Sequence, residues 1–449
     1  MLEGPSYLVS RNLPSSCEQE SKWIYNAFRV IELSNSKHRL EDHGEIPLRK
    51  SCKVQDALDQ GSRQLVKDFP NIFVIQTNQP DDHDHYQNHT GARSDTCSLI
   101  HQLGRDISIN CLLRCSRSDY GSIASVNQNF RSLIRSGELY RLRREMGIVE
   151  HWVYFSCNLL EWKAFDPIHR RWMNLPQMPD NNCFMCADKE SLAVGTELLV
   201  FGKEITSHVI YRYDILTNTW SSGMRMNNPR CLFGSASLGE VAILAGGCDP
   251  LGNILNSAEL YNSETGTWVT LPSMNKARKM CSGVFMDNKF YVIGGMGVGT
   301  SRSLTCGEVY DMTTRTWTVI PDMFPGCNGG VEVTEAPAAV AEAPPLVAVV
   351  NNVLYAADYA QKEVRRYKKD RNLWVSIGRL PDQAVSMNGW GLAFRACGDR
   401  LIVIGGPRGL GGGVIELNSW IPDEGPPHWD LLVQKRSGSF VYNCTVMGC

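Results

Sequence analysis

The sequence predicts a mainly β protein in which a six-bladed β-propeller follows a set of short helices and a disordered N-terminal tail. Two patterns in its 449 residues carry the propeller prediction: a repeated tryptophan motif and a series of short alternating strands. The motif places a tryptophan seven positions after an aromatic residue, which Asp or Asn usually follows. It occurs as FDPIHRRW, YDILTNTW, YNSETGTW, YDMTTRTW and YKKDRNLW, ending at Trp172, Trp220, Trp268, Trp317 and Trp374. A period of about 50 residues indicates repeated units that bury their apolar faces against one another.

Between these tryptophans the chain alternates as short β-strands do, and it closes several units on glycine. Examples are CLFGSASLGEVAILAGG, CSGVFMDNKFYVIGG and GLAFRACGDRLIVIGG. Evenly spaced short strands with glycine pairs and periodic aromatic residues are typical of propeller blades. The glycine pair, the Tyr-Asp or Tyr-Asn step and the tryptophan resemble the kelch repeat, for example at Gly246, Gly247, Tyr261 and Trp268. The second and fifth units lack the glycine pair, so their assignment rests on register.

Counting strands predicts how the propeller closes, because a closed ring leaves no open sheet edge. The first repeat begins at residues 152–157 and supplies three strands, one fewer than a four-stranded blade needs. At the other end, residues 439–447 follow a complete blade and have no partner of their own. We therefore expect six blades over residues 151–449, with this last strand joining the strands that start at Trp152. Trp429 is then the tryptophan of the sixth repeat.

Residues 98–146 carry apolar residues at helical spacings of three and four, which predicts a compact set of short helices. Their opening residues and a later Val-x-x-x-aromatic-Arg-x-Leu-Ile run resemble an F-box, with departures from the usual pattern at Gly104, Asn127 and Phe130. The resemblance implies contacts with a Skp-type adaptor protein by Leu103, Asp106, Ile107, Cys111, Leu112, Val126, Phe130 and Leu133. On spacing alone, the alternative is an ordinary helical cap that packs against the propeller.

The order of these parts, helices first and propeller second, is similar to that of plant F-box/kelch-repeat proteins. That resemblance implies a non-catalytic substrate receptor without a cofactor. The F-box would bind the Skp-type adaptor of a cullin-RING ligase of the SCF type, and the propeller would bind an unknown protein for ubiquitination. Two alternatives stay open, namely a kelch-type propeller oxidase and an interaction scaffold that never meets the ligase.

The oxidase alternative requires metal ligands that converge, and histidine is scarce in the predicted propeller. His151, His169, His208 and His428 fall in separate places, and we expect His169 and His208 in turns. The glycine-rich stretch 405–413 lies between two predicted strands, so the helix N-terminus that phosphate binding uses is missing. We therefore expect neither a metal site nor catalysis.

Residues 1–97 show no sustained period and are rich in polar residues, so we expect a disordered or weakly ordered tail. A cluster from Asp81 to His89 contains metal-ligand types, but no predicted element would hold it, which favours a solvated tail. Cys183 and Cys186 form a single Cys-x-x-Cys pair. Without a second pair, we expect two buried thiols on a blade strand in place of a zinc site.

Charge and cysteine content argue against several classes of function. The chain has 45 basic and 47 acidic residues, and a net charge of −2 provides no field for nucleic acid or membrane. We expect the basic cluster at Arg135, Arg141, Arg143 and Arg144 to end the last helix. The 16 cysteines are too dilute for a disulfide framework, and we find no secretion signal or membrane-spanning run. We expect an intracellular protein, in the nucleus, the cytoplasm or both, that binds neither nucleic acid nor membrane.

The candidate substrate-binding residues precede the inner strands of the predicted blades. Asn388 and Trp390 precede one such strand, and Arg230 and Arg278 precede two others. Trp and Arg are enriched at binding hot spots, which makes this face a candidate for substrate recognition. For the arginines we favour the alternative that they tie neighbouring blades through backbone carbonyls. We expect residues 324–345, rich in Pro, Ala and Glu, to form a mobile loop between blades that either binds a partner or is a tolerated insertion.

Overall fold

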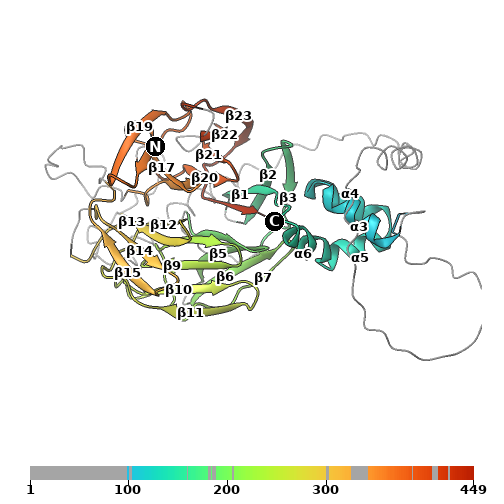
Figure 1. Ribbon diagram of the computed structural model, residues 1–449, viewed down its shortest axis with the longest axis horizontal. Helices are drawn as coiled ribbons and strands as arrows, with labels where there is room; N and C mark the ends of the chain where they lie inside the picture. Colours follow the sequence, from blue (N-terminus) through green and yellow to red (C-terminus); the bar gives the residue numbers. More distant parts are fainter. Residues whose placement is uncertain are drawn as a thin grey trace, which may run out of the picture. The chain divides into compact units, whose positions relative to one another are not determined.

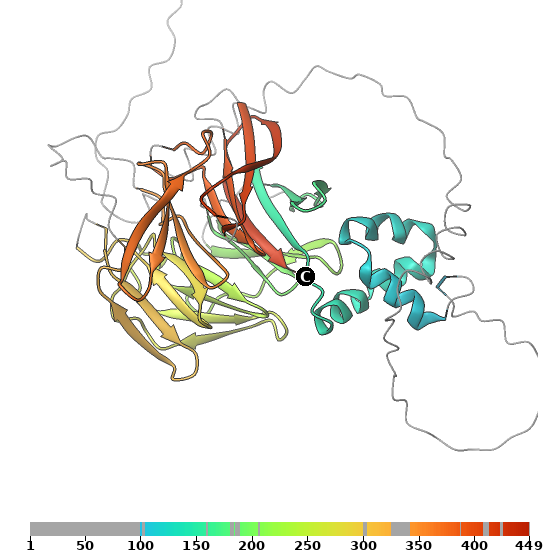
Figure 2. The ribbon, with the colours of Figure 1, turned by 45° about the horizontal axis from the view of Figure 1, so that its top comes forward.

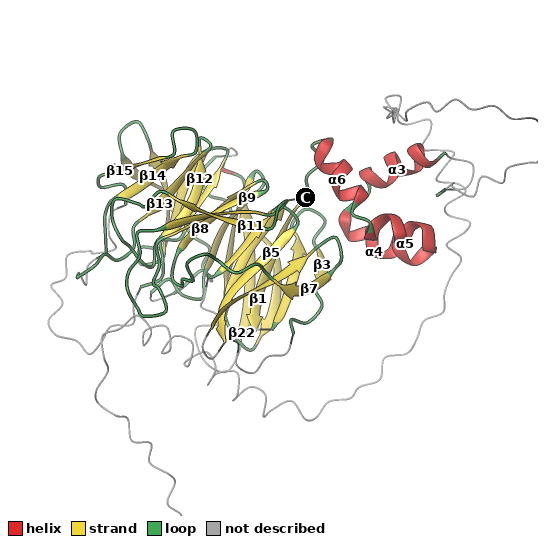
Figure 3. Cartoon of the chain, turned by 90° about the horizontal axis from the view of Figure 1, so that it is seen from below, coloured by secondary structure: helices red, strands yellow, loops and turns green. Residues whose placement is uncertain are grey.

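The structure is a computed structural model, and it describes residues 99–100, 104–158, 160–179, 184, 189–204, 207–299, 303–324, 342–386, 388–406, 413–422 and 425–448. These residues form two compact units that meet in the sequence at Glu150 and His151. Figure 3 shows the helices in the first unit and the strands in the second. The predicted tail, the cluster from Asp81 to His89, Leu103, and the Cys183 and Cys186 pair lie outside the described residues.

The first unit is a set of short helices, as predicted, and its α-helices are labelled in Figure 1. They are α3 (Arg105–Arg114), the 3₁₀ turn η1 (Arg117–Asp119), α4 (Tyr120–Val126), α5 (Gln128–Arg135) and α6 (Glu138–Glu145). Asn127 ends α4 and caps α5, since its side chain accepts a hydrogen bond from the Phe130 amide at 2.9 Å. The basic cluster is divided between two helices: Arg135 ends α5, while Arg143 and Arg144 lie in the last turn of α6.

The second unit consists of six four-stranded antiparallel sheets, which we number as blades 1 to 6. Blade 1 contains β24 (Asn443–Gly448), β1 (His151–Asn158), β2 (Glu161–Asp166) and β3 (Arg171–Asn174). Blade 2 contains β4 (Ser191–Val194), β5 (Glu197–Glu204), β6 (Ser207–Asp214) and β7 (Thr219–Ser222). Blade 3 contains β8 (Gly234–Leu238), β9 (Val241–Ala245), β10 (Ala258–Asn262) and β11 (Thr267–Leu271).

The remaining blades have the same order of strands, from the inside of the ring outward. Blade 4 contains β12 (Ser282–Met286), β13 (Lys289–Ile293), β14 (Gly307–Asp311) and β15 (Thr316–Ile320). Blade 5 contains β16 (Val347–Val350), β17 (Val353–Asp358), β18 (Glu363–Lys368) and β19 (Leu373–Arg379). Blade 6 contains β20 (Ala393–Cys397), β21 (Arg400–Gly405), β22 (Gly413–Trp420) and β23 (Asp430–Ser437).

The C-terminal strand closes the ring, as the strand count predicted. β24 pairs antiparallel with β1, with Trp152 opposite Met447 and Tyr154 opposite Thr445, and Figure 2 shows the two strands side by side. The inner strands contact one another in the order β24, β4, β8, β12, β16 and β20, and β20 returns to β24. The six-bladed prediction is therefore confirmed, and each of the six described inner strands has a neighbour on both sides.

The eight-residue motif folds as the hairpin between the third and fourth strands of a blade. In blade 4, Tyr310 lies directly opposite Trp317, with ring centroids 5.1 Å apart. The Asp311 carboxylate accepts hydrogen bonds from the Thr313 and Thr314 amides, which closes the turn. These bonds and the ammonium group of Lys289, the largest contribution, lower the pKa of Asp311 to about 2. The spacing of aromatic residue, Asp and Trp is therefore a property of the turn itself.

Five of the repeat tryptophans also join their blade to the one before it. The indole nitrogen of Trp268 donates a 3.0 Å hydrogen bond to the carbonyl of Met224 in the preceding connection. Four further indoles do the same: Trp220 to Pro176, Trp317 to Pro272, Trp374 to Met323 and Trp429 to Arg379. Trp429 thus makes the contact of a repeat tryptophan, which confirms its assignment to the sixth blade.

The glycine pairs are required where the chain leaves the second strand of a blade. Gly246 and Gly247 have φ values of 71° and 90°, a region that side chains disfavour. A Cβ atom at Gly247 would lie 2.3 Å from the carbonyl oxygen of Cys231. Gly295 has the same φ of 90° in blade 4. The pair therefore permits a close approach between the connection into the blade and the end of its second strand.

Two connections that the sequence analysis singled out join strands of the propeller. The segment 324–345 connects β15, an outer strand, with β16, an inner strand, as expected, and its residues 325–341 lie outside the described residues. The glycine-rich stretch 405–413 runs from the end of β21 to the start of β22, so it does connect two strands.

Candidate interaction surfaces

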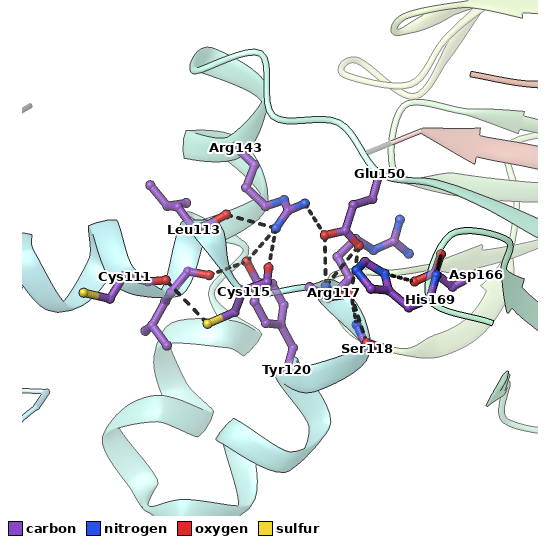
Figure 4. Close-up of polar contacts among 12 residues, drawn as sticks. Cys111, Leu113, Cys115, Arg117, Ser118, Tyr120, Arg143, Glu150, Asp166 and His169 are labelled. Atoms are coloured by element: carbon purple, nitrogen blue, oxygen red, sulfur yellow. Dashed lines mark hydrogen bonds and ion pairs between the residues drawn. The ribbon is translucent and has the colours of Figure 1, made fainter. Parts of the chain in front are cut away.

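The helical unit is organised around a buried arginine, Arg143, in α6 (Figure 4). Its guanidinium group donates to the carbonyl oxygens of Leu113 and Cys115 at 3.1 and 2.8 Å, where α3 ends. It also donates to the Tyr120 hydroxyl at 3.4 Å and forms an ion pair with Glu150 at 2.8 Å. Arg143 therefore satisfies carbonyls at the end of α3 and connects that helix to α6 and to the end of the unit.

Glu150 completes this network from the other side. Its carboxylate accepts hydrogen bonds from the Ser116 hydroxyl at 3.3 Å and from the Arg117 amide at 3.1 Å. Burial lowers the pKa of Arg143, but its bonds to Tyr120 and Glu150 outweigh this effect and the pKa is raised overall. The arginine is held as a charged group between the Tyr120 hydroxyl and the Glu150 carboxylate.

The residues predicted to contact an adaptor divide into an accessible and a buried group. Asp106 and Val126 are exposed, with 54% of Val126 accessible, and Ile107 and Cys111 are half-buried one turn apart on α3. Leu112, Phe130 and Leu133 are buried. The second group therefore supports the helices, and only the first group has accessible side chains.

Sequence reasoning missed the larger part of this unit's core. Leu113 and Leu139 are completely buried, and Tyr120 and Tyr140 pack edge to face with centroids 5.7 Å apart. Leu113 directly follows Leu112, and both leucines are buried, Leu113 more completely. The burial of Arg143 was hard to see in the sequence, because nothing in the pattern separates it from the three other arginines of the same short basic cluster.

Arg230 and Arg278 were candidates for substrate contact, and the structure buries both of them. Arg230 forms an ion pair with Glu259 at 2.6 Å, and Arg278 forms one with Glu308 at 2.8 Å. All four side chains have no accessible surface. A side chain without accessible surface does not contact a partner, so neither arginine belongs to the candidate substrate-binding face.

The contacts of the arginines include backbone carbonyls, as in the alternative that these residues tie neighbouring blades together. Arg230 donates to the backbone carbonyls of Gly246 and Ser257 at 3.2 and 2.7 Å, and the Glu259 carboxylate accepts from the Asn227 and Asn228 amides. The connection from blade 2 is thereby fixed to blade 3. The sequence carried a signal for the missed glutamates, since each lies two residues before the repeat tyrosine, in ELYN and EVYD.

Trp390 lies across the centre of the ring on one face. It precedes the inner strand of blade 6, yet it packs on an apolar cluster from blades 3 and 4 that contains Leu232 and Met280. The ammonium group of Lys189, before blade 2, lies 5.5 Å from the centroid of its ring and donates to the Leu392 carbonyl at 2.9 Å. Blades 2, 3 and 4 are not neighbours of blade 6, so these contacts reach across the axis of the propeller.

Asn388 positions the same connection and remains half-buried. Its backbone carbonyl oxygen accepts a hydrogen bond from the Ala343 amide at 2.8 Å, and its side chain accepts one from the Trp390 amide at 3.4 Å.

Two apolar residues that the sequence analysis missed lie at the tips of loops that follow the glycine pairs. Leu251 is 79% accessible and Val298 is 67% accessible. The glycine-pair spacing in adjacent blades was the signal that could have identified them.

The histidines of the propeller remain separate. His169 lies in the turn between β2 and β3, as expected, where it contacts the Asp166 carboxylate at 2.7 Å. The expectation that His208 lies in a turn was wrong: it belongs to β6, and burial lowers its pKa. Within the described ranges, no three His, Cys, Asp or Glu side chains gather as a metal site would require.

Among the described helices, every one is too short or too polar to span a bilayer.

A closed kelch-type propeller that follows a unit of short helices in the sequence defines the class of protein. The Kelch motif family matches residues 229–275 and 277–324. F-box/kelch-repeat protein At1g74510 of Arabidopsis thaliana is 60% identical over 456 residues, covering 100% of both chains. F-box/kelch-repeat protein SKIP11 of the same plant is 59% identical, covering 99% of this chain and 98% of that protein. The chain belongs to the F-box/kelch-repeat protein family.

Proposed function

We propose that this protein is the substrate-recognition subunit of an SCF-type ubiquitin ligase, acting inside the cell, in the nucleus, the cytoplasm or both. Its helical unit would bind a Skp-type adaptor of a cullin-RING ligase, and its propeller would bind the protein to be ubiquitinated. The observation that carries the proposal is the full-length similarity to F-box/kelch-repeat proteins, which spans both units.

The accessible residues of the helical unit supply the proposed adaptor surface. Ile107 and Cys111 expose part of an apolar stripe on α3, and Val126 exposes more than half of its side chain at the end of α4. Apolar groups that are not needed for the unit's own core are the ones that gain from burial in a complex. Leu112, Phe130 and Leu133 contribute by holding these helices in place.

The face that carries Trp390 supplies the proposed substrate surface. Trp390 and Asn388 are half-buried at the centre, while Leu251 and Val298 project from loop tips. A partly desolvated tryptophan held by its neighbours resembles the anchors found at binding hot spots. Binding there would raise the effective concentration of the substrate beside a charged ubiquitin-conjugating enzyme, so the chain itself needs no catalytic group.

Co-purification with a Skp-type protein tests the adaptor half of the proposal. We expect Val126→Asp and Ile107→Asp to reduce capture at least about tenfold, which corresponds to about 1.4 kcal/mol. Val149→Asp is a matched control, because Val149 belongs to the same unit and is 48% accessible. Leu112→Asp is a poor test, since this buried side chain would report unfolding.

Two outcomes would contradict the ligase assignment. The wild-type protein could fail to capture a Skp-type protein, or Val126→Asp and Ile107→Asp could bind as well as Val149→Asp. Either result would favour the ligase-independent scaffold. For the propeller, affinity mass spectrometry with the wild type and Trp390→Ala should identify partners that the variant loses, and an identical partner set would remove Trp390 from the proposed surface.

A further inference from the structure

Two cysteines face each other where the connection into blade 3 meets the end of its second strand. Cys231 and Cys248 form an isolated antiparallel bridge, with reciprocal backbone hydrogen bonds of 3.0 and 2.8 Å. In such a hydrogen-bonded pair the Cα atoms are about 5.5 Å apart. Disulfides occur at Cα separations of about 4.4–6.8 Å. The backbone therefore places the two Cα atoms within the range found in disulfides, and both residues are thiols in this structure. Opposed Cβ atoms of such a pair are about 4.5–5.5 Å apart and those of a disulfide about 3.5–4.5 Å, so the bond requires a small shift of the two segments toward each other.

The side chains of the pair share one apolar environment. Directly opposed residues of an antiparallel pair point to the same side of the sheet. Cys231 and Cys248 accordingly belong to one buried cluster with Leu232 and Met280, and Trp390 packs against it. Cys248 has no accessible surface and Cys231 is 8% accessible, so an oxidant meets Cys231 first.

The neighbouring blade shows that the bridge does not depend on cysteine. At the equivalent place in blade 4, Lys279 and Met296 form the same isolated bridge with reciprocal hydrogen bonds of 2.9 and 2.7 Å. The backbone arrangement thus belongs to the repeat, whereas the pair of cysteines is particular to blade 3 of these two blades. Among the cysteines that the structure describes, no other two are opposed in a β-bridge.

We propose that Cys231 and Cys248 are an oxidation site that forms an intramolecular disulfide with a peroxide as oxidant. The Cys231 sulfur attacks one oxygen of hydrogen peroxide, giving a sulfenic acid and releasing one water. The Cys248 sulfur then attacks the sulfenic sulfur, forming the S–S bond and releasing a second water. The two thiols lose two hydrogens and two electrons, and the peroxide is reduced to two waters.

The disulfide would act on the face that carries Trp390. Cys231 precedes Leu232, which belongs to the apolar cluster against which Trp390 packs. Cys248 begins the loop that carries Leu251, and its bridge with Ile254 closes that loop. A covalent bond between the two segments would fix the base of this loop. The inference goes beyond the proposed function, because the bond can form and be detected without any partner.

Peptide mapping of the full-length protein tests the proposal. The protein is treated with hydrogen peroxide, remaining thiols are alkylated, and non-reduced peptides are analysed by mass spectrometry. We expect a peptide linking Cys231 to Cys248 that dithiothreitol removes. Cys231→Ala and Cys248→Ala should each abolish it, while Cys397→Ala, a change at another buried cysteine, should leave it intact. Cys248→Met serves if the alanine variant fails to fold, since methionine occupies the matching place in blade 4.

The accessible Met224 provides an internal measure of the peroxide dose, because 59% of its side chain is exposed. The proposal is overturned if Cys231 and Cys248 are both recovered as alkylated thiols at a dose that converts Met224 to its sulfoxide. It is also overturned if Cys231 is recovered only as sulfinic acid, since Cys248 would then have failed to capture the sulfenic intermediate.

Discussion

The hydroxyl of Tyr261 on blade 3 donates a 2.8 Å hydrogen bond to the carboxylate of Glu197 on blade 2. Both side chains are buried, and Arg212 forms an ion pair with the same carboxylate at 2.8 Å. Burial raises the pKa of Glu197 by more than the bonds from Tyr261 and Arg212 lower it. The junction between these blades therefore contains a carboxylate that is protonated more readily than in the unfolded chain.

This junction predicts a pH dependence of stability. The pKa of Glu197 in the folded protein is above its ordinary value of 4.5, so the folded state binds more protons between these two pKa values. The free energy of unfolding contributed by this group therefore falls as the pH rises through that interval. We expect Glu197→Gln to remove this fall in urea unfolding measured from acidic to neutral pH. Glu264→Gln, at an exposed position, should retain it, and a wild-type advantage over Glu197→Gln that grows with pH would refute the assignment.

The buried ion pairs predict a large effect of removing one partner. Glu308→Ala leaves the Arg278 guanidinium buried without its carboxylate and removes the acceptor of the Asn275 and Lys276 amides. We expect a loss of about 3–5 kcal/mol in the free energy of unfolding, measured by chemical denaturation. The double variant Glu308→Ala with Arg278→Met should be more stable than the single variant. Glu264→Ala should change stability by less than about 0.5 kcal/mol, and an equal loss there would contradict the prediction.

Closure of the ring predicts that the last strand is indispensable. A chain ending at Tyr442 lacks β24, which leaves β1 as an open inner edge with Trp152, Val153 and Phe155 uncovered. We expect the truncated chain to aggregate, which size-exclusion chromatography measures. We also expect it to lose a single cooperative thermal transition, which calorimetry measures. Thr445→Ser should behave as wild type, because its hydroxyl keeps the acceptor for the Ala193 amide. A monomeric truncated chain with an unchanged melting temperature would be incompatible with closure by β24.

The network around Arg143 predicts a local effect within the helical unit. Glu150→Ala removes the carboxylate that neutralises Arg143 and accepts the Arg117 amide. We expect a loss of about 1.5–3 kcal/mol in the stability of this unit, since hydrogen bonds to charged groups contribute that much. Hydrogen exchange of the full chain should show faster exchange over residues 105–146 and unchanged exchange in the propeller. Glu145→Ala, at an exposed position of α6, is the control, and matching exchange in the two variants would argue against the network.

The fold was predictable from the sequence because its signals are local. The hairpin motif carries its own turn chemistry, as Asp311 shows by accepting the two following amides, and its aromatic residue and tryptophan face each other directly. Repetition of this unit sets the period, and counting strands predicts residues 439–447 as the missing strand of blade 1, which the structure forms at Asn443–Gly448. The helical spacing in residues 98–146 likewise predicts helices, although the pattern does not distinguish Leu112 from Leu113 as the more deeply buried residue.

The candidate surfaces were only partly predictable, since accessibility depends on neighbours from distant parts of the chain. Arg230 and Arg278 occupy the positions that the sequence analysis gave them, but the glutamates of the same blades bury their charges. Trp390 precedes an inner strand as expected, yet its partners Leu232 and Met280 come from blades that are not neighbours of blade 6. A sequence pattern does not show which of these side chains another blade will cover.

The sequence by itself therefore determined a β-propeller of six repeats, its closure by the final strand, and a helical unit ahead of it, because periodicity and turn chemistry act over a few residues. Only the tertiary structure decided that Arg143, Arg230 and Arg278 are internal, that Trp390 crosses the axis, and that Cys231 opposes Cys248. Burial and pairing of this kind arise when segments far apart in the chain pack together, and their free energies depend on that packing.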